Sequence, residues 1–182
     1  MTTTIEVQQT IPTGTWQLDP VHSSVGFEIP YLVGTFKGQF HDVQAELVVE
    51  KGEARLAGAA EVASVDVKDE NLAAHLQSPD FFDAERNPQL RFNASGIALD
   101  DGAVSVEGEL TIKGVTKAVE VTGTVTEPLV DAYGKERIGL VLTTTVNRHD
   151  FGVSWNIPLP TGKPAVGDDV TIDAELYFVR AA

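Results

Sequence analysis

Apolar and polar residues alternate along most of this chain, which is the pattern of β-strands that bury only one face. Residues 104–112 read VSVEGELTI, in which every second residue is apolar or glycine. The same period recurs at residues 43–49, 119–125, 138–146 and 170–178, and shorter candidate strands lie at residues 15–18, 25–29, 54–67 and 90–97. The alternation therefore predicts an all-β chain of eight or nine antiparallel strands.

The stretch TIKGVTK at residues 111–117 has two interpretations, a phosphate-binding loop or a turn between strands. It lacks the GxxxxGK[ST] spacing of a phosphate-binding loop, and no helical pattern follows it that would present a helix N-terminus to an anion. Alternating segments flank it on both sides instead. We therefore predict that it is the turn of a β-hairpin.

One segment of the chain has a helical pattern. Leu72, Ala73 and Leu76 can share one face of a helix over residues 69–76, and the following Ser78-Pro-Asp80 is suited to begin a second short helix. Residues 1–13 show neither pattern and are expected to form a loose N-terminal tail. Residues 14–182 are expected to form a single domain.

Antiparallel strands in this number must protect their edges, either in a sandwich of two sheets or in a closed barrel. A barrel of about eight strands can hold one small ligand if its inward-facing residues are small. Residues 54–67 contribute little side-chain volume, because they include Ala54, Ala57, Gly58, Ala59, Ala60 and Ala63. These residues either border a cavity or lie beneath large neighbours such as Leu90 and Phe92, and the sequence leaves both interpretations open.

Composition argues against several classes of function. The 13 Lys and Arg against 27 Asp and Glu give a net charge of −14, which repels a nucleic-acid backbone. The chain has no cysteine, which excludes disulfides and cysteine-ligated metals. Residues 1–14 have no basic start and no apolar run, and nowhere do about eighteen apolar residues follow one another. A cytoplasmic protein without an integral membrane segment is therefore expected.

The candidate catalytic and metal-binding residues form no motif. The histidines, at positions 22, 41, 75 and 149, show no metal-ligand spacing, so neither a metal nor another cofactor is predicted. A Ser-His-Asp set drawn from Ser23 or Ser24, His149 and Asp150 lacks the GxSxG elbow found in many such enzymes. These observations favour a protein that is not an enzyme.

Six stretches carry a resemblance to a known family. They read WQLDPVHSSVGF at 16–27, GQF at 38–40, AHLQSPDFFD at 74–83, NPQLRF at 87–92, GELTIKGVTK at 108–117 and NRHDFG at 147–152. In this order they resemble the YceI-like family of polyisoprenoid-binding, lipocalin-like barrel proteins. No single stretch is decisive, but their joint order is specific, and the resemblance spans about residues 14–179.

The resemblance implies an extended antiparallel lipocalin-like β-barrel with one or two short helices. It also implies an apolar tunnel that takes a polyisoprenoid, an isoprenoid quinone or a similar lipid without chemical turnover, the ability to form a homodimer, and relatives that are often exported. This chain departs from the family pattern at Pro30-Tyr31, where a histidine is expected, and at Asn71-Leu-Ala73, where an Arg-Asp pair is expected. Headgroup contacts of relatives are therefore not carried over to these positions.

The lining of such a tunnel and its mouth is expected to consist of aromatic and aliphatic side chains near the family motifs, with one arginine. The ligand-binding candidates are Phe27, Ile29, Tyr31, Phe36, Phe40, Leu76, Phe81, Phe82, Phe92, Arg148 and Trp155. On this acidic chain a lipid pyrophosphate would need local help from Arg148, Lys37 or Arg91, whereas a neutral quinone ring would not. A neutral headgroup is therefore favoured.

Two functions follow as hypotheses. The first is non-catalytic binding, storage or transport of a long apolar lipid in an internal tunnel. The alternative is an enzyme or a stress-related interaction protein on the same barrel that uses His22, His149 or Asp150. In the first case His22 and Asp19 are expected to hold the first turn, and Arg148 and Asp150 to form a structural pair near the tunnel.

Overall fold

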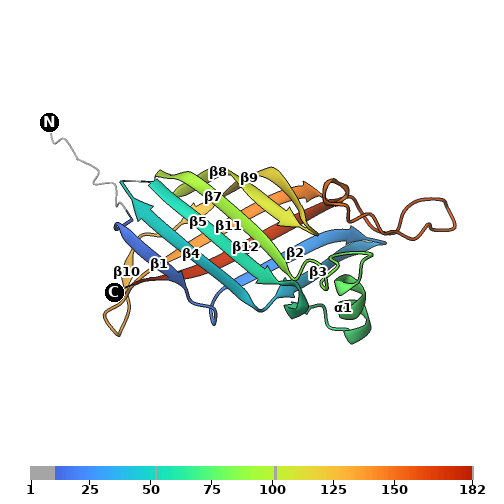
Figure 1. The fold of residues 1–182 in the computed structure, drawn as a ribbon, viewed down its shortest axis with the longest axis horizontal. Coiled ribbons are helices and arrows are strands. Elements are labelled where there is room, and N and C mark those ends of the chain that lie inside the picture. Colours follow the sequence, from blue (N-terminus) through green and yellow to red (C-terminus); the bar gives the residue numbers. More distant parts are fainter. Residues whose placement is uncertain (1–10, 52, 101, 182) are drawn as a thin grey trace.

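The computed structural model describes residues 11–51, 53–100 and 102–181 (Figure 1). Among these residues no helix is long and apolar enough to cross a membrane. The elements, in chain order, are β1 (Gly14–Leu18), β2 (Ser24–Tyr31), β3 (Gly34–Phe40), β4 (Val43–Glu50), β5 (Glu53–Glu61), the 3₁₀ turn η1 (Val62–Ser64), β6 (Val65–Asp66), α1 (Glu70–Gln77), β7 (Gln89–Asp100), β8 (Ala103–Ile112), β9 (Val115–Val125), β10 (Leu129–Val130), β11 (Glu136–Asn147), the 3₁₀ turn η2 (Arg148–Phe151) and β12 (Asp169–Arg180).

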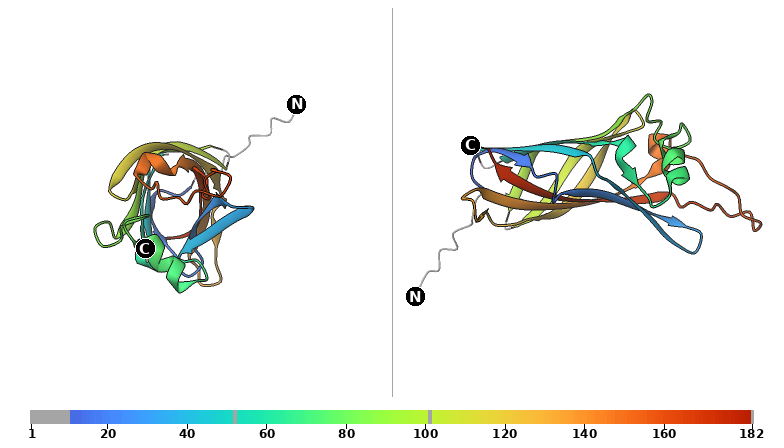
Figure 2. Two further views of the ribbon diagram at one scale, coloured as in Figure 1. Left: turned by 90° about the vertical axis from the view of Figure 1, so that its right-hand side faces the viewer. Right: turned by 90° about the horizontal axis from the view of Figure 1, so that it is seen from below.

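Eight of the strands form a closed antiparallel barrel, shown end on in Figure 2. Each strand pairs with the next in the order β11, β9, β8, β7, β5, β4, β1 and β12, and the pairing of β12 with β11 closes the ring. Closure leaves these strands without free edges, which is how a barrel satisfies its backbone groups. The predicted all-β barrel of about eight strands is confirmed.

The two ends of the barrel are built differently. At one end β12 pairs with β1, where Phe178 lies opposite Leu18, and at the other it pairs with β2, where Ile172 lies opposite Phe27. β10 lies at the first end, whereas α1 lies beside the second, from which β2 and β3 extend outward (Figures 1 and 2). We call these the β10 end and the α1 end.

Large side chains fill the β10 end. Trp16, Leu47, Leu140 and Phe178 are fully buried there in a single cluster. They come from β1, β4, β11 and β12, so residues far apart in the sequence interdigitate across the barrel axis. This part of the barrel is a solid core.

Ile11 also belongs to this cluster, although it was expected to lie in a loose tail. Close to it, Trp16 Nε1 donates a hydrogen bond to the Pro12 carbonyl at 3.1 Å. The packed domain therefore begins before residue 14, because an apolar residue ahead of the first strand joins the core of the β10 end. The rest of the predicted tail, residues 1–10, lies outside the described residues.

The hairpin predicted at TIKGVTK joins β8 and β9. Ile112 pairs with Val115, and the two turn residues, Lys113 and Gly114, have φ values of 51° and 75°. Positive φ at both central residues is the signature of the tight turn that matches the right-handed twist of a hairpin. The prediction of a turn is confirmed.

The helix was predicted correctly, but the second helix expected after it does not form. α1 starts after Asp69, whose Oδ1 accepts a hydrogen bond from the Leu72 N–H at 2.9 Å. The Ser78 hydroxyl donates to the His75 carbonyl at 2.6 Å and so closes the end of α1 instead of starting a new helix. The chain then makes successive turns, and Asp83 adopts a φ of 51°, which interrupts a helix.

A hydrogen-bonded ion network joins two loops at the β10 end. Arg137 Nε donates to Asp131 Oδ2 at 2.6 Å, and Arg137 Nη1 donates to Asp19 Oδ2 at 3.0 Å. Asp131 also accepts hydrogen bonds from the backbone N–H groups of Tyr133 and Lys135. These bonds, that of Arg137 first, lower the pKa of Asp131 from its ordinary value of 3.8 to about 2.

Replacing Asp131 by asparagine should therefore make acid unfolding less steep. A carboxylate whose pKa is lower in the folded state stabilises the fold above its ordinary value of 3.8, and this contribution is lost as the pH falls towards about 2. Circular dichroism in this pH window should show a smaller loss of structure per pH unit for Asp131→Asn, and likewise for Arg137→Met. Slopes equal to that of the wild type in both variants would contradict the network's role.

Candidate functional site

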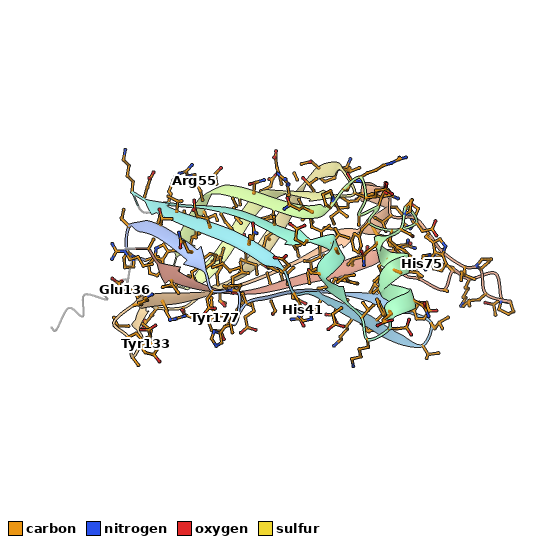
Figure 3. The ribbon with its side chains drawn as sticks, turned by 60° about the horizontal axis from the view of Figure 1, so that its bottom comes forward. His41, Arg55, His75, Tyr133, Glu136 and Tyr177 are labelled. Carbon is orange, nitrogen blue, oxygen red and sulfur yellow. The ribbon has the colours of Figure 1, made fainter. Side chains whose placement is uncertain are left out.

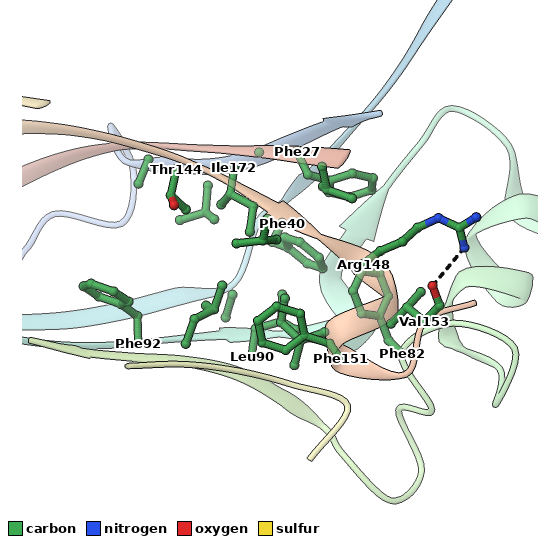
Figure 4. Close-up of a pocket in the computed structure, with 18 of the residues that line it drawn as sticks. Phe27, Phe40, Phe82, Leu90, Phe92, Thr144, Arg148, Phe151, Val153 and Ile172 are labelled. Atoms are coloured by element: carbon green, nitrogen blue, oxygen red, sulfur yellow. Dashed lines mark hydrogen bonds between the residues drawn. The ribbon is translucent and has the colours of Figure 1, made fainter. Parts of the chain in front are cut away.

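A cavity of about 440 Å³ lies inside the barrel, between the core of the β10 end and α1 (Figure 4). Ligand sites typically occupy roughly 300–1,000 Å³, so the volume is that of a binding site and larger than a packing defect. The lining is apolar side chains and glycine, apart from Tyr31, Gln44, His75, Arg91, Thr143, Thr144, Arg148 and Trp155. Such a surface can bury a hydrocarbon but offers few polar contacts.

The cavity exists because small residues face inward on neighbouring strands. Ala45 on β4, and Gly58 and Ala60 on β5, line it. Phe92 lies opposite Gly58, and Leu90 opposite Ala60, in the pairing of β5 with β7, and both large residues line the same cavity. The question left open by the sequence is answered in part for each interpretation: Gly58, Ala59 and Ala60 border a cavity, and Gly58 and Ala60 also face the large neighbours. Ala54 instead lies in the core of the β10 end, and Ala57 and Ala63 are exposed.

Four phenylalanines surround the cavity towards the α1 end. The ring centroid of Phe27 lies 6.1 Å from that of Phe36 and 5.7 Å from that of Phe40. Phe82 follows α1 in the sequence, and its ring lies 5.8 Å from Phe40 and 6.3 Å from Phe27. The segment after the helix therefore packs on β2 and β3 (Figure 4).

A second aromatic group lies where α1 meets the loop that follows η2. The His75 ring centroid lies 4.8 Å from that of Trp155 and 5.0 Å from that of Phe81. His75 Nε2 also lies 3.0 Å from Oδ2 of Asp80, which follows α1, and this contact holds the imidazole ring in its orientation. Figure 3 shows His75 on α1, at the end of the barrel opposite Tyr133. This group holds the helix against the loop at the α1 end.

All eleven residues predicted to bind a ligand line this cavity. They are Phe27, Ile29 and Tyr31 of β2, Phe36 and Phe40 of β3, Leu76 of α1, Phe81 and Phe82 after it, Phe92 of β7, Arg148 of η2 and Trp155 of the next loop. The two departures from the family pattern also lie here, since Tyr31 and Leu72 are lining residues. Contact of each residue with a ligand stays a prediction.

Several lining residues were not predicted. One of them is His75. Others face inward from β11 and β12, namely Leu142, Val146, Ile172, Ala174 and Leu176, and two follow β11, namely Phe151 and Val153. Alternation had identified the inward face of the two strands, but it does not show which part of that face borders a cavity. His75 lay within a family motif and was considered only as a metal ligand.

Arg148 is the buried cation of the site, with 4% of its surface exposed. Its Nη1 donates to the Val153 carbonyl at 2.8 Å (Figure 4). Its Nη1 also donates to the Trp155 carbonyl at 2.9 Å, and its Nε donates to the Gly167 carbonyl at 2.7 Å. Burial lowers its pKa, and its buried Nη2 has no hydrogen-bond partner among the described residues. The predicted pairing of Arg148 with Asp150 is wrong, because the Arg148 guanidinium donates its hydrogen bonds to these carbonyls instead.

The other two cations considered for a headgroup make contacts of their own. Lys37 Nζ lies 3.7 Å from Glu28 Oε2, and its side chain is exposed. The Arg91 side chain donates to Gln89 Oε1 at 2.8 Å and is also exposed. Arg148 is therefore the cation best placed to meet a buried headgroup.

His22 and His149, proposed for the alternative function, lie outside the cavity lining. His22 Nδ1 lies 2.8 Å from Asp19 Oδ2, as predicted for the first turn. His149 Nδ1 lies 3.0 Å from Ser154 Oγ, and its Nε2 lies 2.8 Å from Asp168 Oδ1, which is a Ser-His-Asp set other than the one considered from the sequence. This exposed set links η2 to the start of β12.

In the described part of the chain, no three His, Asp or Glu side chains are grouped to hold a metal ion.

Comparison with known proteins finds YceI-like relatives that match nearly the whole chain. A protein-family model described as a YceI-like domain matches residues 16–178. A UPF0312 protein of Staphylococcus aureus (strain N315) is 32% identical over 168 residues, which cover 88% of this chain and 94% of that protein. A UPF0312 protein of Staphylococcus epidermidis is 32% identical over 173 residues, covering 90% and 96%.

Solved structures share the fold. BcnA of Burkholderia cenocepacia has a TM-score of 0.74 at 25% identity, over 88% of this chain and 98% of that chain. The YCEI protein of Campylobacter jejuni has a TM-score of 0.70 at 28% identity, over 91% and 97%. A polyisoprenoid binding domain from Saccharophagus degradans, with a TM-score of 0.68 at 15% identity over 91% and 98%, is similar in fold. With its barrel, its motifs and these relatives, this chain belongs to the family of YceI-like domains.

Proposed function

We propose that this protein binds a long apolar lipid, such as a polyisoprenoid or an isoprenoid quinone, and stores or transports it without changing it chemically. The observation that carries the proposal is the cavity of about 440 Å³ inside a closed barrel, with a lining that is almost entirely apolar. The Saccharophagus degradans domain with the same fold is described as polyisoprenoid-binding, which agrees with the proposal.

The energetics of burial are sufficient for such binding. Each CH₂ group transferred from water to an apolar cavity contributes roughly 0.8 kcal/mol. Several prenyl units together therefore offset an association cost on the order of 4–15 kcal/mol. Because burial of the tail supplies most of the affinity, few polar contacts are needed.

The headgroup proposed for this lipid is neutral and carries an oxygen acceptor. The unpartnered Nη2 of Arg148 can donate one hydrogen bond to a carbonyl oxygen, for example that of a quinone. A pyrophosphate would bring more charge than one arginine can match, and the Lys37 and Arg91 side chains are exposed and already contact Glu28 and Gln89. Arg148 therefore supports a single polar contact at the α1 end of the cavity.

Organic extraction of protein purified from its natural host, followed by mass spectrometry, tests the proposal. We expect a prenyl or acyl lipid in a stoichiometric amount, with an oxygen-bearing headgroup. Repeated extracts without lipid, together with failure of the purified protein to retain added polyprenol or quinone, would contradict it. A cytoplasmic location and a homodimer remain predictions, to be checked by fractionation and by light scattering.

The same preparation tests the enzymatic alternative. The bound lipid should keep its mass during prolonged incubation, and His22→Ala, His149→Ala and Asp150→Ala should retain it like the wild type. A time-dependent change in lipid mass that one of these substitutions abolishes would favour an enzyme. Ser154, His149 and Asp168 are not among the residues that line the cavity of about 440 Å³, so that cavity adds no support for the alternative.

A further inference from the structure

Two segments project from the α1 end of the barrel. One is the tip of the β2–β3 hairpin, residues 30–34, and the other is the loop of residues 155–165 (Figures 1 and 2). They are joined at their bases, because Leu32 N–H donates to the Ala165 carbonyl at 3.0 Å and Gly167 N–H donates to the Pro30 carbonyl at 2.8 Å. We call these two segments the mouth loops.

The mouth loops expose apolar side chains that packing does not explain. Leu32 is 56% exposed and Val33 is 106% exposed, so both side chains point into solvent, as does that of Ile157. Leu32 also has a φ of 49°, in the left-handed region that glycine and asparagine usually occupy in a hairpin turn. A strained, exposed leucine beside an exposed valine contributes little to the stability of this fold. Such a departure from local preference is typical of a functional surface.

The same region lacks the acidic character of the rest of the chain. Residues 29–36 contain no charged residue, and residues 151–167 contain only Lys163, although the chain as a whole carries a net charge of −14. Because these two segments carry no acidic residue, an anionic lipid surface repels this end less than the rest of the molecule. Tyr31 and Trp155, which line the cavity at the base of these loops, are residue types that favour the boundary between water and lipid.

We propose that the mouth loops dock on a lipid bilayer surface, with Leu32, Val33 and Ile157 inserted among the headgroups. The inference rests on the proposed lipid binding and adds to it the membrane as partner. Because the exposed apolar residues continue into the cavity through Tyr31, a lipid tail passes between bilayer and barrel with little exposure to water. A second copy of the chain is the competing partner, but a specific interface needs about 800 Å² on each partner, more than two narrow turns readily supply.

Flotation with vesicles of phosphatidylethanolamine and phosphatidylglycerol tests the inference. The test variant is Leu32→Asp with Val33→Asp, in which aspartate tolerates the left-handed backbone of residue 32. The matched control is Leu129→Asp with Val130→Asp, on β10 at the opposite end, where the two side chains are 68% and 62% exposed. We expect the wild type and the control to float with the vesicles and the test variant to lose roughly tenfold or more of this binding.

Lipid extraction and light scattering on the same samples separate the outcomes. If the wild type retains its lipid but does not float, the docking inference is overturned and the proposed function stands. Flotation of the test variant at the wild-type level also overturns the inference. If the wild type does not float but forms a dimer, and the test variant is a monomer, the surface binds a second copy of the chain instead. If the wild type floats but never contains or retains lipid, the surface stands and the proposed function fails.

Discussion

Replacing Gly58 by leucine should expel lipid from the barrel and leave the fold intact. Gly58 faces the cavity from β5, and a Cβ atom added there would meet Gln44 O at 3.6 Å and Ala45 Cβ at 3.7 Å, which are ordinary contacts. A leucine can therefore be accommodated at its backbone, and its branched end enters the cavity. The leucine side chain takes the space of about four carbon groups of the lipid. Burial of each such group contributes roughly 0.8 kcal/mol, so their loss raises the Kd for the lipid by about two orders of magnitude.

The matched control for this variant is Ala57→Leu. Ala57 is the preceding residue on β5 and is exposed on the outer face, so the same side chain placed there leaves the cavity unchanged. Mass spectrometry of extracts and displacement of a fluorescent fatty acid should show lipid loss in Gly58→Leu alone. Thermal unfolding should show a Tm for Gly58→Leu at or above that of the wild type, since a filled cavity gains contacts. Full lipid retention by Gly58→Leu would show that the ligand lies elsewhere.

Trp16→Ala should be among the most destabilising single substitutions in this protein. Trp16 has 0% of its surface exposed and lies in the core of the β10 end with Leu47 and Phe178. Truncating a buried tryptophan costs about 3–5 kcal/mol, because transfer energy is lost and a cavity remains. That is a large part of the roughly 5–15 kcal/mol that separates folded from unfolded domains.

The second tryptophan of the chain supplies the control. Trp155 is half-buried at the α1 end and lines the cavity, so Trp155→Ala should lower the free energy of unfolding much less. Urea unfolding followed by circular dichroism compares the two variants with the wild type. Equal losses of stability would mean that the α1 end is as tightly packed as the β10 end, against the structure described above.

Several features of the fold were predictable because they depend on neighbouring residues. The alternation in residues 104–112, the turn at Lys113-Gly114 and the helix near residues 69–76 each follow from a few adjacent side chains and were correctly predicted. The second helix at Ser78 was not, because its hydroxyl closes α1 instead. That choice depends on where the preceding helix ends.

The candidate site was predictable to a different extent. Seven of the eleven predicted residues lie within the family motifs, and Ile29, Tyr31, Phe36 and Trp155 lie a few residues outside them; alternation alone would have recovered only the inward-facing strand positions. The role of Arg148 was not predictable in detail. Its partners are the carbonyls of Val153, Trp155 and Gly167, and backbone carbonyls leave no pattern in side-chain identity.

The sequence by itself determined most of the strands, though not β3 or β10, the face that these strands bury and the membership of one family, because these properties arise from local alternation and short motifs. The tertiary structure alone decided where the barrel is solid and where it is hollow. That outcome depends on the summed volume of side chains that meet at one level of the barrel from different strands, such as Trp16 with Phe178 at the β10 end and Ala45 with Gly58 in the cavity. Closure of β11 on β12 completes the ring of strands, and only then does the size of the inward-facing side chains leave a core or a cavity.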